Sequence, residues 1–164
     1  MSILKRELEV YLRYGDLEAE FKGDPETVRN EVIRWLDKVV PGFLLATNVL
    51  IEPDYRSLAE KLSRYVNATR SGDIILLNES SALSMQMRVL ATLGMAKILY
   101  LSELREDESM TLEELSSIVV STPKSVSSRL SELRSNGLVE KVVRSKPVKY
   151  RITLSGLLHL LDKL

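Results

Sequence analysis

The chain has 164 residues, 23 of them basic and 23 acidic, so its formal net charge near neutral pH is zero. This length suits one large domain or two small ones with a hydrophobic core. The absence of cysteine excludes disulfides, thiolate chemistry and zinc sites with cysteine ligands.

The charge is unevenly distributed along the chain. Residues 1–81 hold 11 basic and 14 acidic residues, a net of −3, whereas residues 82–164 hold 12 and 9, a net of +3. Within residues 121–153 the count is 8 basic against 2 acidic. This local basic excess, rather than the overall balance, favours a nucleic-acid partner.

Neither a leader peptide nor a membrane span is expected. The first ten residues, MSILKRELEV, lack the apolar core of a secretory signal. The most apolar stretch, 83–104, is interrupted by Arg88 and Lys97, which argues against a transmembrane helix. We therefore expect a soluble cytoplasmic protein without a membrane partner.

The N-terminal part has the pattern of a hairpin followed by a helix. Polar and apolar residues alternate over 8–22 around Gly15-Asp16, and a two-residue turn there would place Tyr14 opposite Leu17. Asp24 and Pro25 then form a helix start, and Pro41-Gly42 forms a stop. The predicted unit is of ββα type, because a lone hairpin is marginal in water.

The sequence pattern of the middle of the chain predicts secondary structure less definitely. Residues 43–51 fit a short helix or a strand equally well, and Pro53 with Asp54 begins another amphipathic helix. Residues 74–77 are interpreted as a short buried strand that joins the N-terminal sheet. Residues 78–81 are the best boundary between a small α+β domain, 1–81, and a second domain, 82–164.

The second domain begins with a helical pattern over 83–104 that is apolar on more than one face. We expect this helix to contact the N-terminal half or a second subunit as well as its own domain. Three methionines on it, Met85, Met87 and Met95, are core residues in the simplest interpretation and an adaptable effector pocket in the alternative.

A helix, a tight turn, a second helix and a hairpin are predicted over 111–154. Thr122 followed by Pro123 starts the second helix, and Gly137 ends it. The apolar stripe of this helix is Val126, Leu130 and Leu133. Two strand runs, 138–144 and 148–154, flank a tip at 145–147.

The sequence SVSSRLSELRSNGLVEK, followed by a basic hairpin that ends in YRITLSG, resembles the recognition helix and wing of a winged helix-turn-helix domain. The resemblance is to MarR- and ArsR-type transcription regulators and covers about 85–156, and no family is recognised for residues 1–81. It implies an α+β protein whose C-terminal winged helix-turn-helix domain binds double-stranded DNA, with a homodimer reading two half-sites.

The resemblance also implies which side chains would contact DNA. Those near the start of the recognition helix would enter the major groove, and those of the wing would lie along the backbone or in a minor groove. Glu132 on the helix could accept a hydrogen bond from cytosine. The candidate DNA-binding residues are Thr122, Lys124, Ser125, Ser127, Ser128, Arg129, Arg144, Lys146, Lys149 and Arg151.

The alternatives to DNA binding are a protein-interaction module and an enzyme. A winged helix can also serve as a protein–protein interaction module in a larger assembly, because fold does not determine function. Residues 1–81 would then be a second contact surface. An enzyme is not expected, because the only histidine, His159, lies in a leucine-rich terminal helix, and no phosphate loop, metal spacing or nucleophile–base pair is visible. We therefore expect no catalytic residues, cofactor or metal.

The terminal stretch 157–164 is apolar on almost every side. We expect this helix to dock on another surface, such as a dimer partner.

Overall fold

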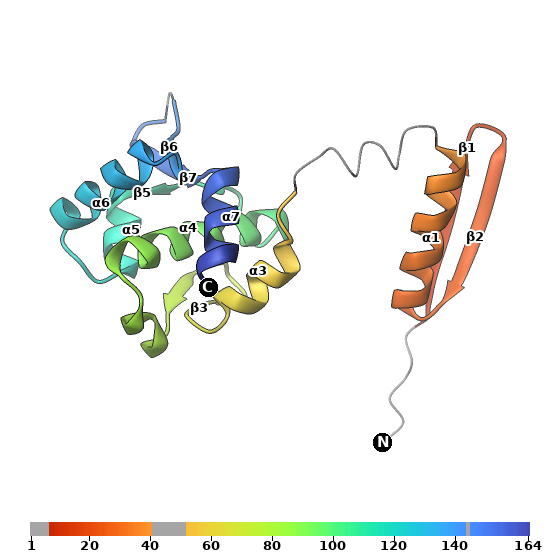
Figure 1. Ribbon diagram of the computed structural model, residues 1–164, viewed down its shortest axis with the longest axis horizontal. Helices are drawn as coiled ribbons and strands as arrows, with labels where there is room; N and C mark the ends of the chain where they lie inside the picture. Colours follow the sequence, from red (N-terminus) through yellow and green to blue (C-terminus); the bar gives the residue numbers. More distant parts are fainter. Residues whose placement is uncertain (1–6, 41–51, 144) are drawn as a thin grey trace, which may run out of the picture. The chain divides into compact units, whose positions relative to one another are not determined.

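The computed structural model describes residues 7–40, 52–143 and 145–164, which form an α+β protein (Figure 1). The chain divides into two compact units, residues 1–51 and 52–164. They are called unit 1 and unit 2 below, and each is described by itself. The segment 43–51 and the candidate residue Arg144 lie outside the described residues.

Unit 1 consists of β1 (Leu8–Tyr14), β2 (Leu17–Gly23) and α1 (Pro25–Val39). The predicted register of the hairpin is confirmed, since Tyr14 pairs with Leu17 and Val10 with Phe21. The predicted helix start is also confirmed, because the Asp24 carboxylate accepts a hydrogen bond of 3.0 Å from the Thr27 amide. The Phe21 ring meets Trp35 of α1 edge to face, with centroids 6.5 Å apart, so the helix packs on this face of the hairpin.

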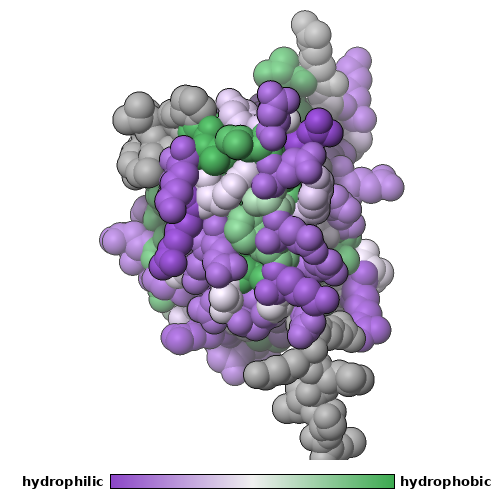
Figure 2. All heavy atoms as spheres, turned by 90° about the vertical axis from the view of Figure 1, so that its right-hand side faces the viewer, coloured by the Kyte–Doolittle hydropathy of each residue, from purple (hydrophilic) through white to green (hydrophobic). Residues whose placement is uncertain are grey.

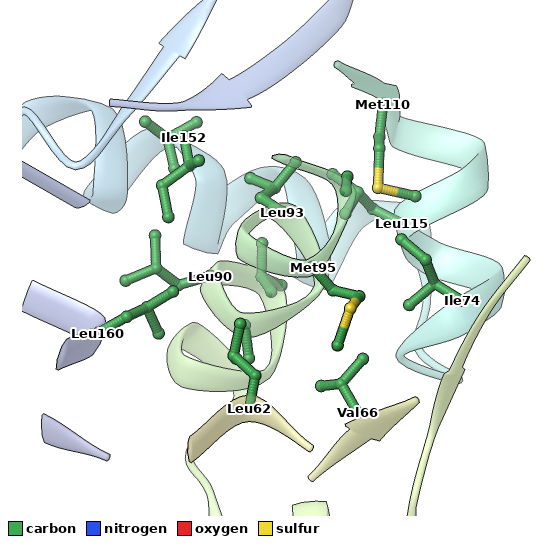
Figure 3. Close-up of a cluster of buried hydrophobic side chains, with 14 of the residues drawn as sticks. Leu62, Val66, Ile74, Leu90, Leu93, Met95, Met110, Leu115, Ile152 and Leu160 are labelled. Carbon is green, nitrogen blue, oxygen red and sulfur yellow. The ribbon is translucent and has the colours of Figure 1, made fainter. Parts of the chain in front are cut away.

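Unit 2 is built around the helix α4 (Met85–Leu101). Every residue from Val89 to Ala96 is buried, so α4 has no solvent-exposed face over these turns. Its neighbours are α3 (Tyr55–Leu62), α5 (Leu112–Ile118), α6 (Pro123–Ser135), α7 (Leu154–Lys163) and several short strands. Figure 3 shows Leu90, Leu93 and Met95 of α4 surrounded by side chains from these neighbours. The apolar character that sequence analysis attributed to a second contact surface is thus explained within unit 2.

The strand at 74–77 does not join the N-terminal sheet, and this expectation is corrected. It appears as β4 (Ile74–Leu76), which among the described residues pairs with β3 (Val66–Ala68) and with no other strand. The division into units also differs from the boundary expected at 81/82, since α3, β3 and β4 pack against α4. Residues 78–81, the expected boundary, lie in a short 3₁₀ helix, η1 (Asn78–Ala82), in which Ser80 is buried.

The succession of helix, turn, helix and hairpin predicted over 111–154 is present. Its strands β6 (Val139–Lys141) and β7 (Lys149–Ile152) are shorter than predicted. A strand that sequence analysis missed, β5 (Met110–Thr111), pairs with β7 and completes a sheet in the order β5-β7-β6. The α5–α6 turn and the β6–β7 hairpin therefore belong to one compact arrangement on α4.

The terminal helix α7 docks inside its own unit. Leu157 and Leu160 are buried against α4 and α3, and Lys61 of α3 donates a hydrogen bond of 2.6 Å to the Leu161 carbonyl. A Cβ atom on Gly156 would lie 2.2 Å from the Leu138 carbonyl oxygen, so only glycine permits this close approach. The apolar surface expected to need a dimer partner is largely covered by unit 2 itself.

Candidate nucleic-acid interface

The orientation of α6 is determined by its apolar stripe. Val126, Leu130 and Leu133 are buried, and α6 packs mainly on α4 and α5. The exposed Thr122 caps the helix, since its hydroxyl accepts a hydrogen bond of 3.3 Å from the Ser125 amide. Thr122 is therefore held as a helix cap at the start of the exposed surface.

The surface of α6 opposite the core is slender and polar. Lys124, Ser128, Ser131 and Ser135 recur at helical spacing on this side, and all four are exposed. The hydroxyls of Ser131 and Ser135 donate to the carbonyls of Ser127 and Ser131, at 3.1 Å and 3.0 Å. Short side chains bonded to their own helix leave room for close approach of another molecule. We call these four residues the α6 stripe.

Ser125 and Ser127, both predicted to contact DNA, are half-buried and flank this stripe on either side. Arg129 and Glu132 lie on the side of α6 that faces the start of α4. Arg129 Nη1 is 2.8 Å and 2.9 Å from the two Glu132 carboxylate oxygens, and Gln86 of α4 also donates to this carboxylate. The expectation that Glu132 is available to a cytosine is corrected, because its oxygens are already occupied by these donors.

Two of the predicted wing cations are also held by acidic side chains. Lys149 Nζ lies 2.6 Å from Asp107 Oδ2. Arg151 bridges two carboxylates, with Nε 2.5 Å from Glu140 and Nη1 3.1 Å from Glu108. Lys97 of α4 pairs with the same Glu108. Three basic and three acidic side chains therefore balance one another around β7, and the local basic excess is smaller than the sequence count of 121–153 suggests.

The pKa values reflect this pairing. Partial burial would raise the pKa of Asp107, but hydrogen bonds from Lys149 and Ser109 outweigh it and lower the pKa from 3.8 to about 2. The hydrogen bond to Glu140 and the charge of Glu108 raise the pKa of Arg151. The pKa shifts of Asp107 and Arg151 therefore both favour their charged forms.

Other basic side chains are exposed and have no ion pair within the part of the chain that the structure describes. They are the predicted site residues Lys124 and Lys146, and also Arg134 and Lys141, which lie in the same basic region and are not among the predicted site residues. Arg134 and Lys141 line an open hollow between the C-terminal half of α6 and β6. A helical projection of α6 places Arg134 beside the α6 stripe, so the sequence alone is sufficient to predict Arg134 as a site residue.

The turn between α5 and α6 carries an exposed apolar residue. Val120 is 88% exposed and adopts a left-handed backbone conformation with φ of 50°. Val143, near the tip of the hairpin, is 82% exposed. Both lie close in sequence to the predicted site, at the two ends of the α6–β6 segment.

Among residues 7–40, 52–143 and 145–164, no group of three His, Cys, Asp or Glu side chains is placed to hold a metal ion. None of the helices in this part is both long and apolar enough to cross a membrane.

Comparison with known proteins gives little further guidance. No family model matches the chain, and no curated protein matches it. A MarR family protein from Bacillus stearothermophilus is similar in structure, with a TM-score of 0.36 and 17% sequence identity over 86% of this chain and 76% of that chain. A match at this level establishes neither a shared fold nor a shared function.

Proposed function

We propose that unit 2 contains a winged helix-turn-helix DNA-binding module and that the protein is a small transcription regulator. In this proposal α6 enters the major groove of double-stranded DNA, and the β6–β7 hairpin is the wing that follows the backbone. A homodimer would present two such modules to two half-sites.

The observation that carries the proposal is the α6 stripe. It is a capped, solvent-facing helix surface of one lysine and three serines, and exposed cations flank it on α6 and the hairpin. Serine hydroxyls contact either phosphates or bases, and unpaired lysines neutralise phosphates. The contact residues proposed here are Lys124, Ser128, Arg134, Lys141 and Lys146. Thr122, Ser125 and Ser127 border this surface, and Arg144 remains a candidate from sequence alone. Arg129, Lys149 and Arg151 are assigned to holding the module together.

The test is to measure binding to random-sequence duplex DNA by fluorescence anisotropy over a series of salt concentrations. The wild type is expected to bind at low salt and to weaken steeply as salt rises, because each neutralised phosphate releases a counterion. A Lys124→Ala/Lys146→Ala variant is expected to lose about two units of slope in the plot of log affinity against log salt.

The matched control is Arg64→Ala/Arg70→Ala, which removes two exposed charges from unit 2 at positions outside α6 and the hairpin. It should retain the wild-type slope. An equal loss of slope in both variants would indicate a diffuse electrostatic attraction rather than a defined site. An absence of binding at low salt by the folded wild type would refute the proposal.

A second candidate function is a winged-helix module that binds a protein. It is favoured by the exposure of Val120 and Val143 and by the pairing of three predicted DNA cations with carboxylates. In that case a Val120→Ser/Val143→Ser variant would lose a partner recovered with the wild type, whereas Lys124→Ala/Lys146→Ala would keep it. Apolar anchors, rather than phosphate contacts, would then supply the affinity.

A further inference from the structure

Unit 1 has very little interior for a folded unit. Among its described residues, 7–40, only Val28 is buried. Several large apolar side chains of the hairpin remain exposed, including Tyr11 at 60%, Leu17 at 52% and Tyr14 at 46%. A two-stranded hairpin with one helix is marginal in water unless more apolar surface is covered. On the face that Figure 2 presents, hydrophobic side chains reach the surface between hydrophilic ones.

The hairpin also has an unpaired edge. β1 pairs with β2 on one side, and no strand of the described residues pairs with its other side. Alternate residues of a strand direct their N–H and C=O groups away from a neighbouring antiparallel strand, so β1 presents a row of unsatisfied donors and acceptors. Such an edge is a template for another strand.

The sequence of β1 is complementary to itself. If two copies of β1 pair antiparallel about a twofold axis at Tyr11, Glu9 lies opposite Arg13 of the second copy. Leu8 then lies opposite Tyr14 of the second copy, and Val10 lies opposite Leu12. All seven residues of β1 pair, and no two like charges face each other. Apolar residues meet on the α1 side, and charged residues meet on the other.

The charges of β2 extend this complementarity across the hairpin. Lys22 lies opposite Glu9, and Glu18 lies opposite Arg13, with Arg13 Nε 3.5 Å from Glu18 Oε1. A row across the combined sheet would therefore read Lys22, Glu9, then Arg13 and Glu18 of the second copy. Positive and negative groups alternate along the whole row.

The edge of β2 is a poorer candidate for the same pairing. An antiparallel pair centred on Glu20 would place two Glu20 carboxylates opposite each other. A pair centred on Ala19 would place Glu18 opposite Glu20 of the second copy. Like charges directly opposite each other destabilise a sheet. A pair centred on Phe21 would place Glu20 opposite Lys22 but would join only five residues of β2. β1 is therefore the strand of this hairpin that is complementary to itself along its whole length.

We propose that two copies of the chain associate through β1, forming a four-stranded antiparallel sheet in the order β2-β1-β1-β2 with both α1 helices on one face. This association is independent of DNA binding. It would bring two unit 2 modules together in one molecule, which a protein reading two half-sites needs.

The first test is a charge exchange on the full-length chain, with the dimer dissociation constant measured by sedimentation without DNA. Glu9→Arg and Arg13→Glu are each expected to raise the constant about tenfold, because each creates two like-charge pairs in the dimer. An equimolar mixture of the two variants should form a heterodimer that is tighter than either homodimer, since every charged pair across the interface is then of opposite sign. A hairpin that had simply unfolded would not be rescued by mixing.

Arg29→Glu, an exposed charge reversal on α1, is the matched control and should dimerise like the wild type. A wild-type protein that stays monomeric at every concentration would overturn the proposal. So would two variants whose mixture is no tighter than either alone.

The second test locates the pairing register by cross-linking. The chain has no cysteine, so a Tyr11→Cys variant carries a single thiol. A short bifunctional thiol reagent should join two copies of it efficiently, because position 11 meets itself across the twofold axis. Glu20→Cys, on the neighbouring strand of the same hairpin, should cross-link poorly. Preferential cross-linking at position 20 would place the interface on β2 and overturn the proposal.

Discussion

The ammonium group of Lys149 lies 2.6 Å from the carboxylate of Asp107, joining β7 of the hairpin to the loop before β5. Their separation in sequence is 42 residues, so this contact is tertiary. Together with Arg151 and its partners, it fixes the base of the hairpin against the body of unit 2. Of the hairpin cations, Lys149 and Arg151 are thus held by carboxylates, whereas Lys141 and Lys146 have no ion pair among the described residues.

This ion pair predicts a dependence of stability on acid. The folded-state pKa of Asp107 is depressed from 3.8 to about 2, so its contribution is complete above pH 4 and is lost as pH falls toward 2. The shift corresponds to roughly 2.4 kcal/mol, and screening reduces this to about 1 kcal/mol because the side chain is 44% exposed. Urea unfolding of the Asp107→Asn variant should show a shallower loss of stability between pH 4 and pH 2.

Glu106→Gln is the control for this measurement, since Glu106 is an exposed carboxylate beside Asp107 without an ion pair among the described residues. It should follow the wild-type curve. An Asp107→Asn curve parallel to the wild type throughout would contradict the assigned role.

Arg129 and Lys124 lie on the same helix but are predicted to behave differently. Arg129→Ala should lower the free energy of unfolding by about 0.5 kcal/mol or less, because its pair with Glu132 is partly exposed. It should leave the salt slope of DNA binding unchanged. Lys124→Ala should leave stability unchanged and reduce that slope by about one unit. If Arg129→Ala reduces the slope as much as Lys124→Ala does, Arg129 contacts DNA despite its pairing with Glu132.

The strained turn between α5 and α6 offers a stabilising substitution. Val120 has φ of 50°, and a β-branched residue in this region is destabilised by about 1–2 kcal/mol, a strain that glycine does not have. After the greater backbone freedom of glycine in the unfolded chain is included, Val120→Gly should stabilise unit 2 by about 0.5–1 kcal/mol. Thermal unfolding of the variant and the wild type measures this difference in stability. Val143→Gly, an equally exposed valine whose φ is not positive, should give no gain.

The docking of α7 can be tested with two neighbouring leucines. Leu160 is fully buried against the core, and Leu158 is 39% exposed. Leu160→Ala should destabilise unit 2 by about 2–5 kcal/mol, because it removes buried methyl groups and leaves a cavity. Leu158→Ala should change stability little. If Leu158→Ala instead weakened a dimer while leaving unfolding unchanged, α7 would contribute to an interface between copies.

Features encoded by neighbouring residues could be predicted from the sequence. The register of the first hairpin follows from alternation around Gly15-Asp16, and the helix starts at Asp24 and Thr122 follow from a capping side chain before a proline. Each depends on groups within a few residues of one another. The inward stripe of α6 was predictable for the same reason.

Features that depend on distant partners were not predictable. The strand β5 has only two residues, too few for any periodicity, and it exists because β7 supplies its hydrogen bonds. The pattern of 74–76 identified a strand but not its partner, which is β3 rather than the first hairpin. The carboxylates that pair with Lys149 and Arg151 lie mainly outside the basic region 121–153. A charge count over consecutive residues therefore overestimated the free positive charge of the candidate site.

The enclosure of α4 has a practical consequence for dividing this chain into pieces. The elements that cover α4 come from both sides of it in the sequence, from Tyr55 in α3 to Lys163 in α7. A fragment that began at residue 82 would open the side of α4 that α3, β3 and β4 cover, exposing buried leucine and valine side chains to water. The shortest stretch that closes every side of α4 starts near residue 52, so a truncated protein made to study the C-terminal module should begin there.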